Sequence, residues 1–128
     1  MSVGVLIMTH DGIGASLFGT AKFMLKECPM PVKIISTSRD SDVDKLKNTV
    51  TMLVEELDNG DGVLVLTDLI GATPTNIVLA LKQELNISIV TGINLSMLVR
   101  VLNYPELTLK ELTEKAYSGG IDGITIET

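Results

Sequence analysis

Short apolar runs rich in Val, Ile and Leu alternate along this 128-residue chain with longer amphipathic stretches. The short runs have the length and composition of β-strands, and they cover residues 3–8, 32–36, 63–66 and 87–90. The third run is apolar at every position, as expected for a strand that helices cover on both faces. The alternation predicts an α/β fold, in which a doubly wound, flavodoxin-like sheet of four parallel strands lies between two layers of helices.

The amphipathic stretches are expected to be helices, because their apolar residues recur every three or four positions. They span about 14–26, 42–57, 73–84, 94–102 and 108–116. Side chains able to cap these helices stand at their starts: Ser41 or Asp42, Thr73 with Pro74 at the first helical position, Asn94, and Thr108 with Glu111. After Gly119 and Gly120, alternating apolar residues in Ile121–Glu127 predict a last extended segment.

The bulk composition excludes several classes of function. A net charge of −6 and only 3% aromatic residues argue against binding to nucleic acids or anionic membranes. Cys28 is the only cysteine, so the chain forms no internal disulfide, and the first apolar run is too short to cross a bilayer. We therefore expect one domain, residues 1–128, in a cytoplasmic protein that does not insert into a membrane.

The residues best suited to chemistry follow the expected strands. Three loops carry them, Thr9–Gly14, Thr67–Pro74 and Thr91–Asn94. In an open parallel sheet, sites form at the carboxyl ends of strands, where the strand order reverses. The first and third strands are neighbours in a flavodoxin-like order, so we expect the only histidine, His10, to lie beside Asp68.

A carboxylate next to a histidine has a clear chemical use. If Asp68 accepts a hydrogen bond from one ring nitrogen of His10, the other nitrogen keeps its lone pair and can attack an electrophile. The two helix starts nearby suit an anion such as a phosphoryl group, with Gly71 and Ala72 allowing close backbone approach and Thr73 adding a hydroxyl donor. The simpler alternatives stay open: Asp68 as a loop cap and Thr73 as an ordinary helix start.

Several other classes of site are missing from the sequence. It contains no phosphate-binding loop of the Gly-x-x-x-x-Gly-Lys-Ser/Thr type and no Gly-x-Ser-x-Gly nucleophile elbow. One histidine and one cysteine do not make a zinc site of the usual kind. We therefore expect neither a metal nor a cofactor.

Three segments resemble a known family. They are Met8–His10, Leu64–Asn76 and Thr91–Leu98, and the similarity extends over nearly the whole chain. The sequence resembles the IIA component of the mannose-type phosphoenolpyruvate:sugar phosphotransferase system (PTS). The resemblance implies a phosphotransferase that carries a phosphoryl group in sugar transport, on a free-standing IIA domain without a IIB domain.

The resemblance also implies roles for individual residues and partners. His10 would be phosphorylated on Nε2 and Asp68 would orient its Nδ1–H, while Gly71, Ala72 and Thr73 would line the phosphoryl site. The phosphohistidine carrier HPr, itself charged by enzyme I, would be the donor, and a IIB protein would be the acceptor. The family forms homodimers in which the last strand crosses to the partner and pairs antiparallel with its sheet, a role expected for Ile121–Glu127.

Two residues depart from the family pattern. Asp11 follows the histidine, where small or apolar residues are commoner, and its charge repels a phosphoryl group unless it points away. Ser96 stands where the family often has proline. Three alternatives remain at this point: a phosphoryl donor to a dihydroxyacetone kinase, a regulatory module whose docking depends on the phosphorylation of His10, and a non-catalytic binder of small ligands.

Overall fold

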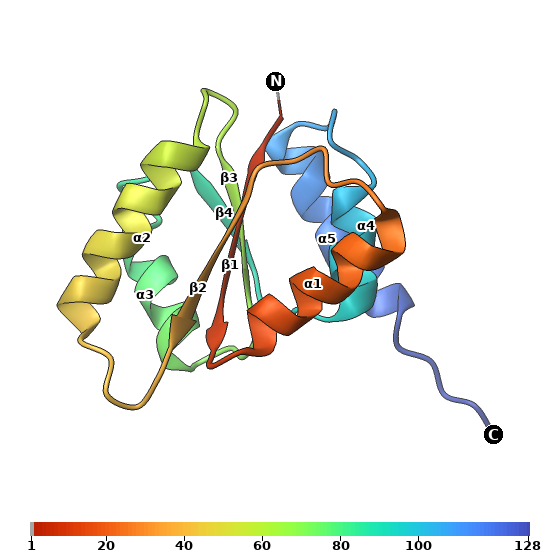
Figure 1. The fold of residues 1–128 in the computed structure, drawn as a ribbon, viewed down its shortest axis with the longest axis horizontal. Coiled ribbons are helices and arrows are strands. Elements are labelled where there is room, and N and C mark those ends of the chain that lie inside the picture. The colour runs from red at the N-terminus through yellow and green to blue at the C-terminus, as the bar shows by residue number, and fades with distance from the viewer. Residues whose placement is uncertain (1) are drawn as a thin grey trace.

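A four-stranded parallel sheet forms the centre of the molecule in the computed structural model, which describes residues 2–128 (Figure 1). Its strands are β1 (Gly4–His10), β2 (Val32–Thr37), β3 (Val63–Thr67) and β4 (Ile87–Val90), in the order β2-β1-β3-β4. This architecture confirms the expected α/β fold with four parallel strands. The order places β1 between β2 and β3, with Met8 beside Thr67 in the register of the central pair.

Five helices cover the sheet: α1 (Ile13–Leu25), α2 (Val43–Leu57), α3 (Thr73–Leu81), α4 (Leu95–Leu102) and α5 (Leu109–Asp122). Figure 1 shows α2 and α3 on one side and α1, α4 and α5 on the other. The side chains of β1 alternate accordingly, because successive residues of a strand face opposite ways. Val5 and Ile7 pack in the core under α1, α4 and α5, whereas Leu6 and Met8 pack under α2 and α3.

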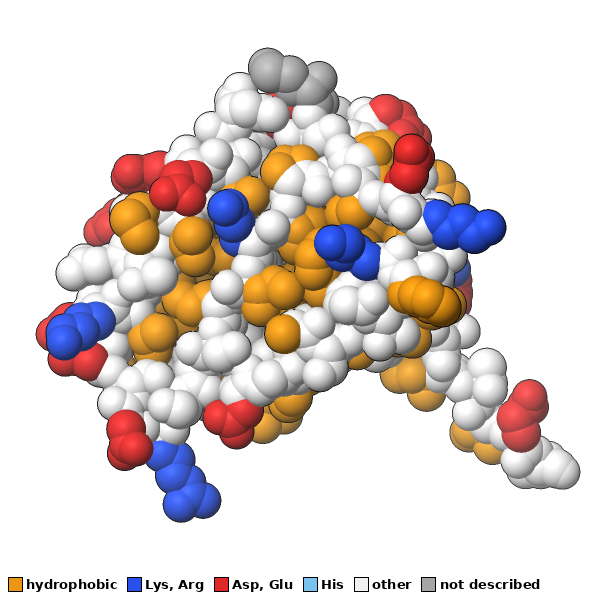
Figure 2. Space-filling model, viewed as in Figure 1, with side chains coloured by type: hydrophobic (Ala, Val, Ile, Leu, Met, Phe, Trp, Pro, Cys, Tyr) orange, Lys and Arg blue, Asp and Glu red, His pale blue; other side chains and the backbone are white. Residues whose placement is uncertain are grey.

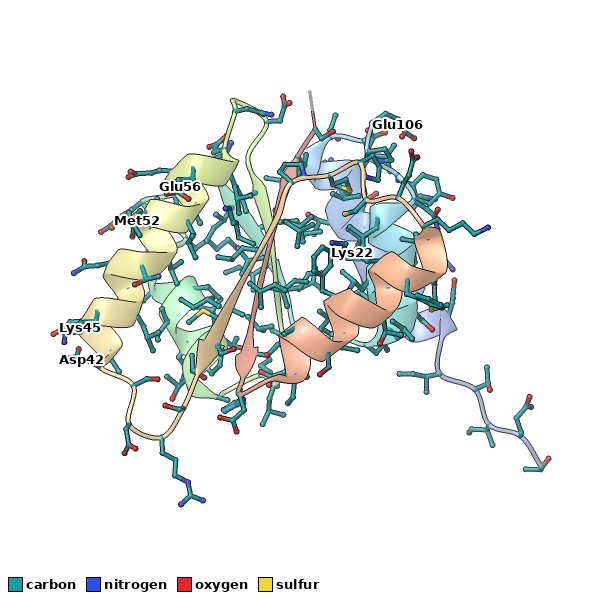
Figure 3. All side chains as sticks on the ribbon, viewed as in Figure 1. Lys22, Asp42, Lys45, Met52, Glu56 and Glu106 are labelled. Atoms are coloured by element: carbon teal, nitrogen blue, oxygen red, sulfur yellow. The ribbon has the colours of Figure 1, made fainter. Side chains whose placement is uncertain are left out.

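The predicted caps of three helices are confirmed. The Asp42 carboxylate accepts hydrogen bonds from two backbone N–H groups at the start of α2, and Asn94 accepts one from the N–H of Met97 in α4. Thr108 and Glu111 form a reciprocal capping box at α5. Since α2 is amphipathic, Val50, Val54 and Leu57 are buried. Figure 3 shows Asp42, Lys45, Met52 and Glu56 along its other side.

The third helix differs from the prediction at both ends. Ala72, in an extended backbone conformation, is the N-cap, and Thr73 is the first helical residue, so its hydroxyl does not cap the helix. The helix ends at Leu81 rather than near Glu84, because the N–H of Lys82 already bonds three residues back, to Leu79. Residues 82–84 are turns that lead into β4.

The expected strand at the carboxyl end needs a larger correction. Helix α5 continues through Gly119 and Gly120 to Asp122, so Ile121 does not begin a strand. A Cβ atom on Gly119 would lie 2.6 Å from Cβ of Arg100, and one on Gly120 would lie 2.8 Å from Cε of Met97. The two glycines thus allow α5 to lie against α4. Residues 123–128 leave the domain as an exposed tail that joins none of the strands β1–β4 (Figure 1).

The surface is mixed in character. In Figure 2, apolar side chains, with two basic groups among them, occupy the middle of the view between α1 and α2, where Figure 1 places the edge strand β2, and most other charged groups lie around the edge of the view. Across residues 2–128, no helix has the length and apolar character needed to span a bilayer.

Candidate functional site

His10 and Asp68 meet at the carboxyl edge of the sheet, as the strand order predicts. His10 is the last residue of β1, and Asp68 follows directly on β3. The Nδ1 atom of His10 lies 2.9 Å from Oδ2 of Asp68, and the backbone N–H of His10 donates to the same oxygen at 3.0 Å. Two adjacent parallel strands therefore hold the ring and the carboxylate in fixed register.

These contacts decide which ring nitrogen is free. Because Oδ2 is an acceptor, the proton of the neutral imidazole resides on Nδ1 and the lone pair on Nε2. The His10 side chain is 42% exposed and that of Asp68 only 12% exposed. The arrangement leaves a nucleophilic nitrogen free on a partly exposed ring and keeps the supporting carboxylate largely buried.

The pKa of Asp68 lies below the ordinary value for a carboxyl group. Burial works in the opposite direction and raises the pKa, but hydrogen bonds from the backbone and ring of His10, with the charge of that ring, outweigh it. The other carboxylate oxygen, Oδ1, is buried and has no hydrogen-bond partner among residues 2–128. Asp68 is therefore an ionised group held by the backbone N–H and the ring of His10, and its charge stabilises a positive charge on that ring.

Two buried threonines hold the loop that carries Asp68. The hydroxyl of Thr75 donates its proton to the carbonyl of Leu69 at 2.8 Å, so the hydroxyl of Thr67, 2.6 Å away, is the donor to Thr75. This role of Thr75 was not expected from the sequence. Its signal was a hydroxyl on an otherwise apolar side of α3, three residues after the N-cap Ala72.

The start of α1 is fixed to the end of β1. The N–H of Gly14 donates to Oγ1 of Thr9 at 2.8 Å. A Cβ atom on Gly14 would lie 2.8 Å from Cγ2 of Ile7, so only glycine lets the helix begin this close to the strand. Asp11, in between, has a φ of 42°, the left-handed region that non-glycine residues rarely adopt.

A cavity of about 450 Å³ borders the histidine. Its lining residues come from the ends of β1 and β2, the loop before α2, and the starts of α2 and α3: His10, Asp11, Thr37, Ser38, Arg39, Ser41, Val43 and Thr73. The structure thus brings Thr73 to the same cavity as His10. Gly71, with a φ of 81°, and Ala72 form the turn before α3 and are not among these lining residues.

The third loop has a structural use. Asn94 caps α4, and its Nδ2 also donates to the carbonyl of Gly120 at 3.1 Å, while the N–H of Ile93 bonds to Thr67 at the end of β3. Asn94 is therefore a cap that ties α4 to α5. Among residues 2–128, no group of three or more His, Cys, Asp or Glu side chains is placed to hold a metal ion.

Comparison with known proteins gives one family. The profile of the EIIA-man family, described as PTS system fructose IIA component, matches residues 4–117. A search of curated protein sequences gave no match.

Solved structures share the fold. The mannose/sorbose specific IIA subunit of a phosphotransferase system from Enterococcus faecalis superposes with a TM-score of 0.88 at 21% identity, covering 100% of this chain and 96% of that one. The phosphotransferase system component EIIA from Streptococcus agalactiae gives 0.81 at 23% identity, covering 97% and 96%. The PTS IIA protein associated with the fucose utilization operon from Streptococcus pneumoniae gives 0.76 at 27% identity, covering 92% and 93%.

Proposed function

Since the chain belongs to the EIIA-man family of PTS IIA components, which are phosphoryl carriers of sugar phosphotransferase systems, we propose that it carries the phosphoryl group on Nε2 of His10. The observation that supports this most directly is the 2.9 Å contact between Nδ1 of His10 and Asp68, which leaves Nε2 of this partly exposed side chain free. Gly71, Ala72 and Thr73 are the proposed phosphoryl-site residues, and of these Thr73 borders the cavity beside His10.

The proposed step is an in-line displacement at phosphorus. The lone pair of Nε2 forms the new N–P bond while the N–P bond of the donor phosphohistidine breaks, and that electron pair returns to the donor ring. The proton on Nδ1 stays in place, so the phosphorylated ring gains positive character, which the ionised Asp68 stabilises. Acceptance and release of the phosphoryl group follow the same path in opposite directions.

The proposed partners are those of the family. HPr serves as donor and a IIB protein as acceptor, and residues 1–128 act as a single IIA domain. Two alternatives, phosphoryl donation to a dihydroxyacetone kinase and a purely regulatory role, differ from this proposal only in the partner that the phosphorylated protein binds. The family match favours neither of these.

We also propose that the tail after α5 completes a homodimer. Ile124 is 72% exposed and Ile126 is 89% exposed, and β4 forms an edge of the sheet. A hollow of about 470 Å³ beside β4, lined in part by Ile89 and Tyr117, offers apolar surface to such side chains. The tail would pair antiparallel with the partner's sheet and cover this edge. Removing the tail should change a sedimenting dimer into a monomer, whereas an intact chain that sediments as a monomer contradicts this assembly.

Phosphotransfer labelling tests the central proposal. Purified protein is incubated with radiolabelled phosphoenolpyruvate, enzyme I and HPr, and the modified residue is mapped by mass spectrometry. Label is expected on His10 and should be lost in His10→Ala. Label that persists in this variant overturns the assignment.

Two further reactions refine the test. Asp68→Asn should keep the fold and slow labelling, because the ring loses its charged support, and an unchanged rate removes the role given to Asp68. Labelled protein mixed with a IIB protein or with a dihydroxyacetone kinase then identifies the acceptor. Transfer to the kinase alone contradicts the IIB assignment.

A further inference from the structure

Two side chains of opposite charge border the cavity beside His10 without a charged partner. Asp11 follows His10 directly, and Arg39 lies in the loop between β2 and α2. Both are exposed, and neither forms an ion pair with any residue from 2 to 128. Arg39 is the one cation among the residues that line this cavity.

The backbone fixes this juxtaposition. His10 lies opposite Thr37 in the register of β1 and β2. The N–H of Asp11 then donates to the carbonyl of Thr37 at 2.8 Å, which extends the pairing by one residue. Arg39 follows Thr37 by two residues, so the chain delivers its side chain to the mouth of the same cavity.

A phosphoryl group on Nε2 of His10 needs a cation here. Nδ1 is engaged by Asp68, so Nε2 is on the opposite side of the ring, and the cavity is the hollow that borders the ring. A phosphoryl group carries nearly two negative charges, and on His10 it would lie near the carboxylates of Asp11 and Asp68. An arginine suits this position because its planar guanidinium binds two phosphoryl oxygens at once.

We propose that Arg39 binds the phosphoryl group carried by His10 and offsets the charge of Asp11. This inference rests on the proposed phosphorylation of His10. Arg39 and Asp11 thereby act in opposite directions on the second ionisation of the phosphoryl group: Arg39 favours the dianion and Asp11 disfavours it. The adjoining wall contributes Ser38, Ser41 and Thr73, which are neutral hydroxyl groups.

Other charged residues near this edge, Asp40 beside Arg39 among them, are not among the residues that line the cavity. Asp68 bonds to the His10 ring, and Asp42 caps α2 through its carboxylate. Lys47 lies in a separate groove between α2 and α3. Substitutions of Arg39 and Asp11 therefore test how side-chain charge at this cavity affects the phosphoryl group.

Phosphorus NMR of the phosphorylated protein measures this directly, because the resonance follows the second ionisation of the phosphoryl group. Arg39→Gln should raise that second pKa by about half a unit to one unit, since a cation that favours the dianion is lost. Asp11→Asn should lower it, since a repelling charge is lost. Arg39→Gln should also slow phosphotransfer from HPr by about tenfold, and Arg39→Lys should restore part of the rate.

Lys45→Gln is the matched control, because it removes the same charge from the exposed side of α2 (Figure 3). It should leave the pKa and the rate at their wild-type values. An Arg39→Gln protein that is labelled on His10 but titrates like the Lys45→Gln control overturns this inference. Wild-type protein that takes no label on His10 instead overturns the proposed function, which separates the two failures.

Discussion

The interior of the central strands β1 and β3 is buried and apolar, whereas their carboxyl ends are polar, and the change takes place within two residues. From Val5 to Met8, β1 is completely buried and apolar, and the same holds for β3 from Val63 to Leu66. Within the next two residues both segments become polar: β1 ends at His10, and Asp68 directly follows the last residue of β3. The interior residues fill two cores, whereas the end residues form one hydrogen-bonded pair beside a cavity.

The contrast separates stability from chemistry along a single strand. Interior side chains are packed against many neighbours, so truncating one of them lowers the stability of the whole domain. Side chains at the strand ends are positioned by a few hydrogen bonds, and removing these bonds changes the orientation of the His10 ring before it changes the stability of the domain. Four substitutions test this separation through the free energy of unfolding, and their expected effects decrease from the strand interior to the strand end.

Leu66→Ala tests the interior. Leu66 is fully buried in the core under α1, α4 and α5, so the substitution should lower the free energy of unfolding by about 2–5 kcal/mol through lost burial and a cavity. Urea denaturation followed by circular dichroism measures the change. A loss below about 1 kcal/mol would mean that the core can collapse around the gap and that the contrast is overstated.

Gly14→Ala tests the junction between interior and end. The added Cβ would lie 2.8 Å from Ile7 and 3.0 Å from Oγ1 of Thr9, so we expect a loss of about 1–3 kcal/mol as α1 shifts away from β1. Gly19→Ala is the control in the same helix, because nothing lies within 4 Å of its new Cβ. This control should gain up to about 1 kcal/mol from helix propensity. Equal effects at both glycines would show that the close approach has no cost.

Thr75→Val tests the support beneath the loop. Valine keeps the shape but leaves the hydroxyl of Thr67 and the carbonyl of Leu69 without their buried partner, which should cost about 1–2 kcal/mol. Thr49→Val on α2 is the control, since its hydroxyl donates to a carbonyl of its own helix at an exposed position. The two variants are compared in the same urea series. A smaller loss at Thr75 than at Thr49 contradicts the proposed support.

Asp68→Asn tests the end alone and should change the free energy of unfolding least. The pKa of Asp68 is lowered in the folded protein, so the ionised group contributes stability above its unfolded pKa, and this contribution is lost as the pH falls through the folded pKa. The stability difference between wild type and variant should therefore shrink on acidification below about pH 4. Denaturation series at neutral and acidic pH measure it, and a difference that grows in acid contradicts the pairing.

Much of the fold could be predicted because its determinants are local. The four apolar runs became the four strands, and Asp42, Asn94 and Thr108 cap the helices as expected, since a cap depends on the few residues beside it. The neighbouring positions of His10 and Asp68 also followed, because they require only the strand order. The catalytic roles of these residues remain predictions.

What the sequence did not reveal depends on contacts between distant segments. Gly119 and Gly120 resemble a turn in the sequence, but they lie inside α5, where Arg100 and Met97 of α4 leave no room for larger side chains. The hydroxyl pair of Thr67 and Thr75 needs β3 and α3 to be packed together before it exists. Arg39 reaches the cavity only through the pairing of β2 with β1, which no local pattern reports.

The central position of β1 also has a consequence during synthesis. It is the first of the four strands in chain order, yet Asp68, which directly follows its neighbour β3, comes 58 residues after His10. At the usual translation rate of roughly 5–20 residues per second, His10 leaves the ribosome roughly 3–12 seconds ahead of Asp68. In that interval β2 is made before β3, so the nascent chain lacks only one of the two neighbours of β1 at the end. The earliest moment at which the His10 ring is correctly oriented is therefore set by the arrival of β3 and Asp68.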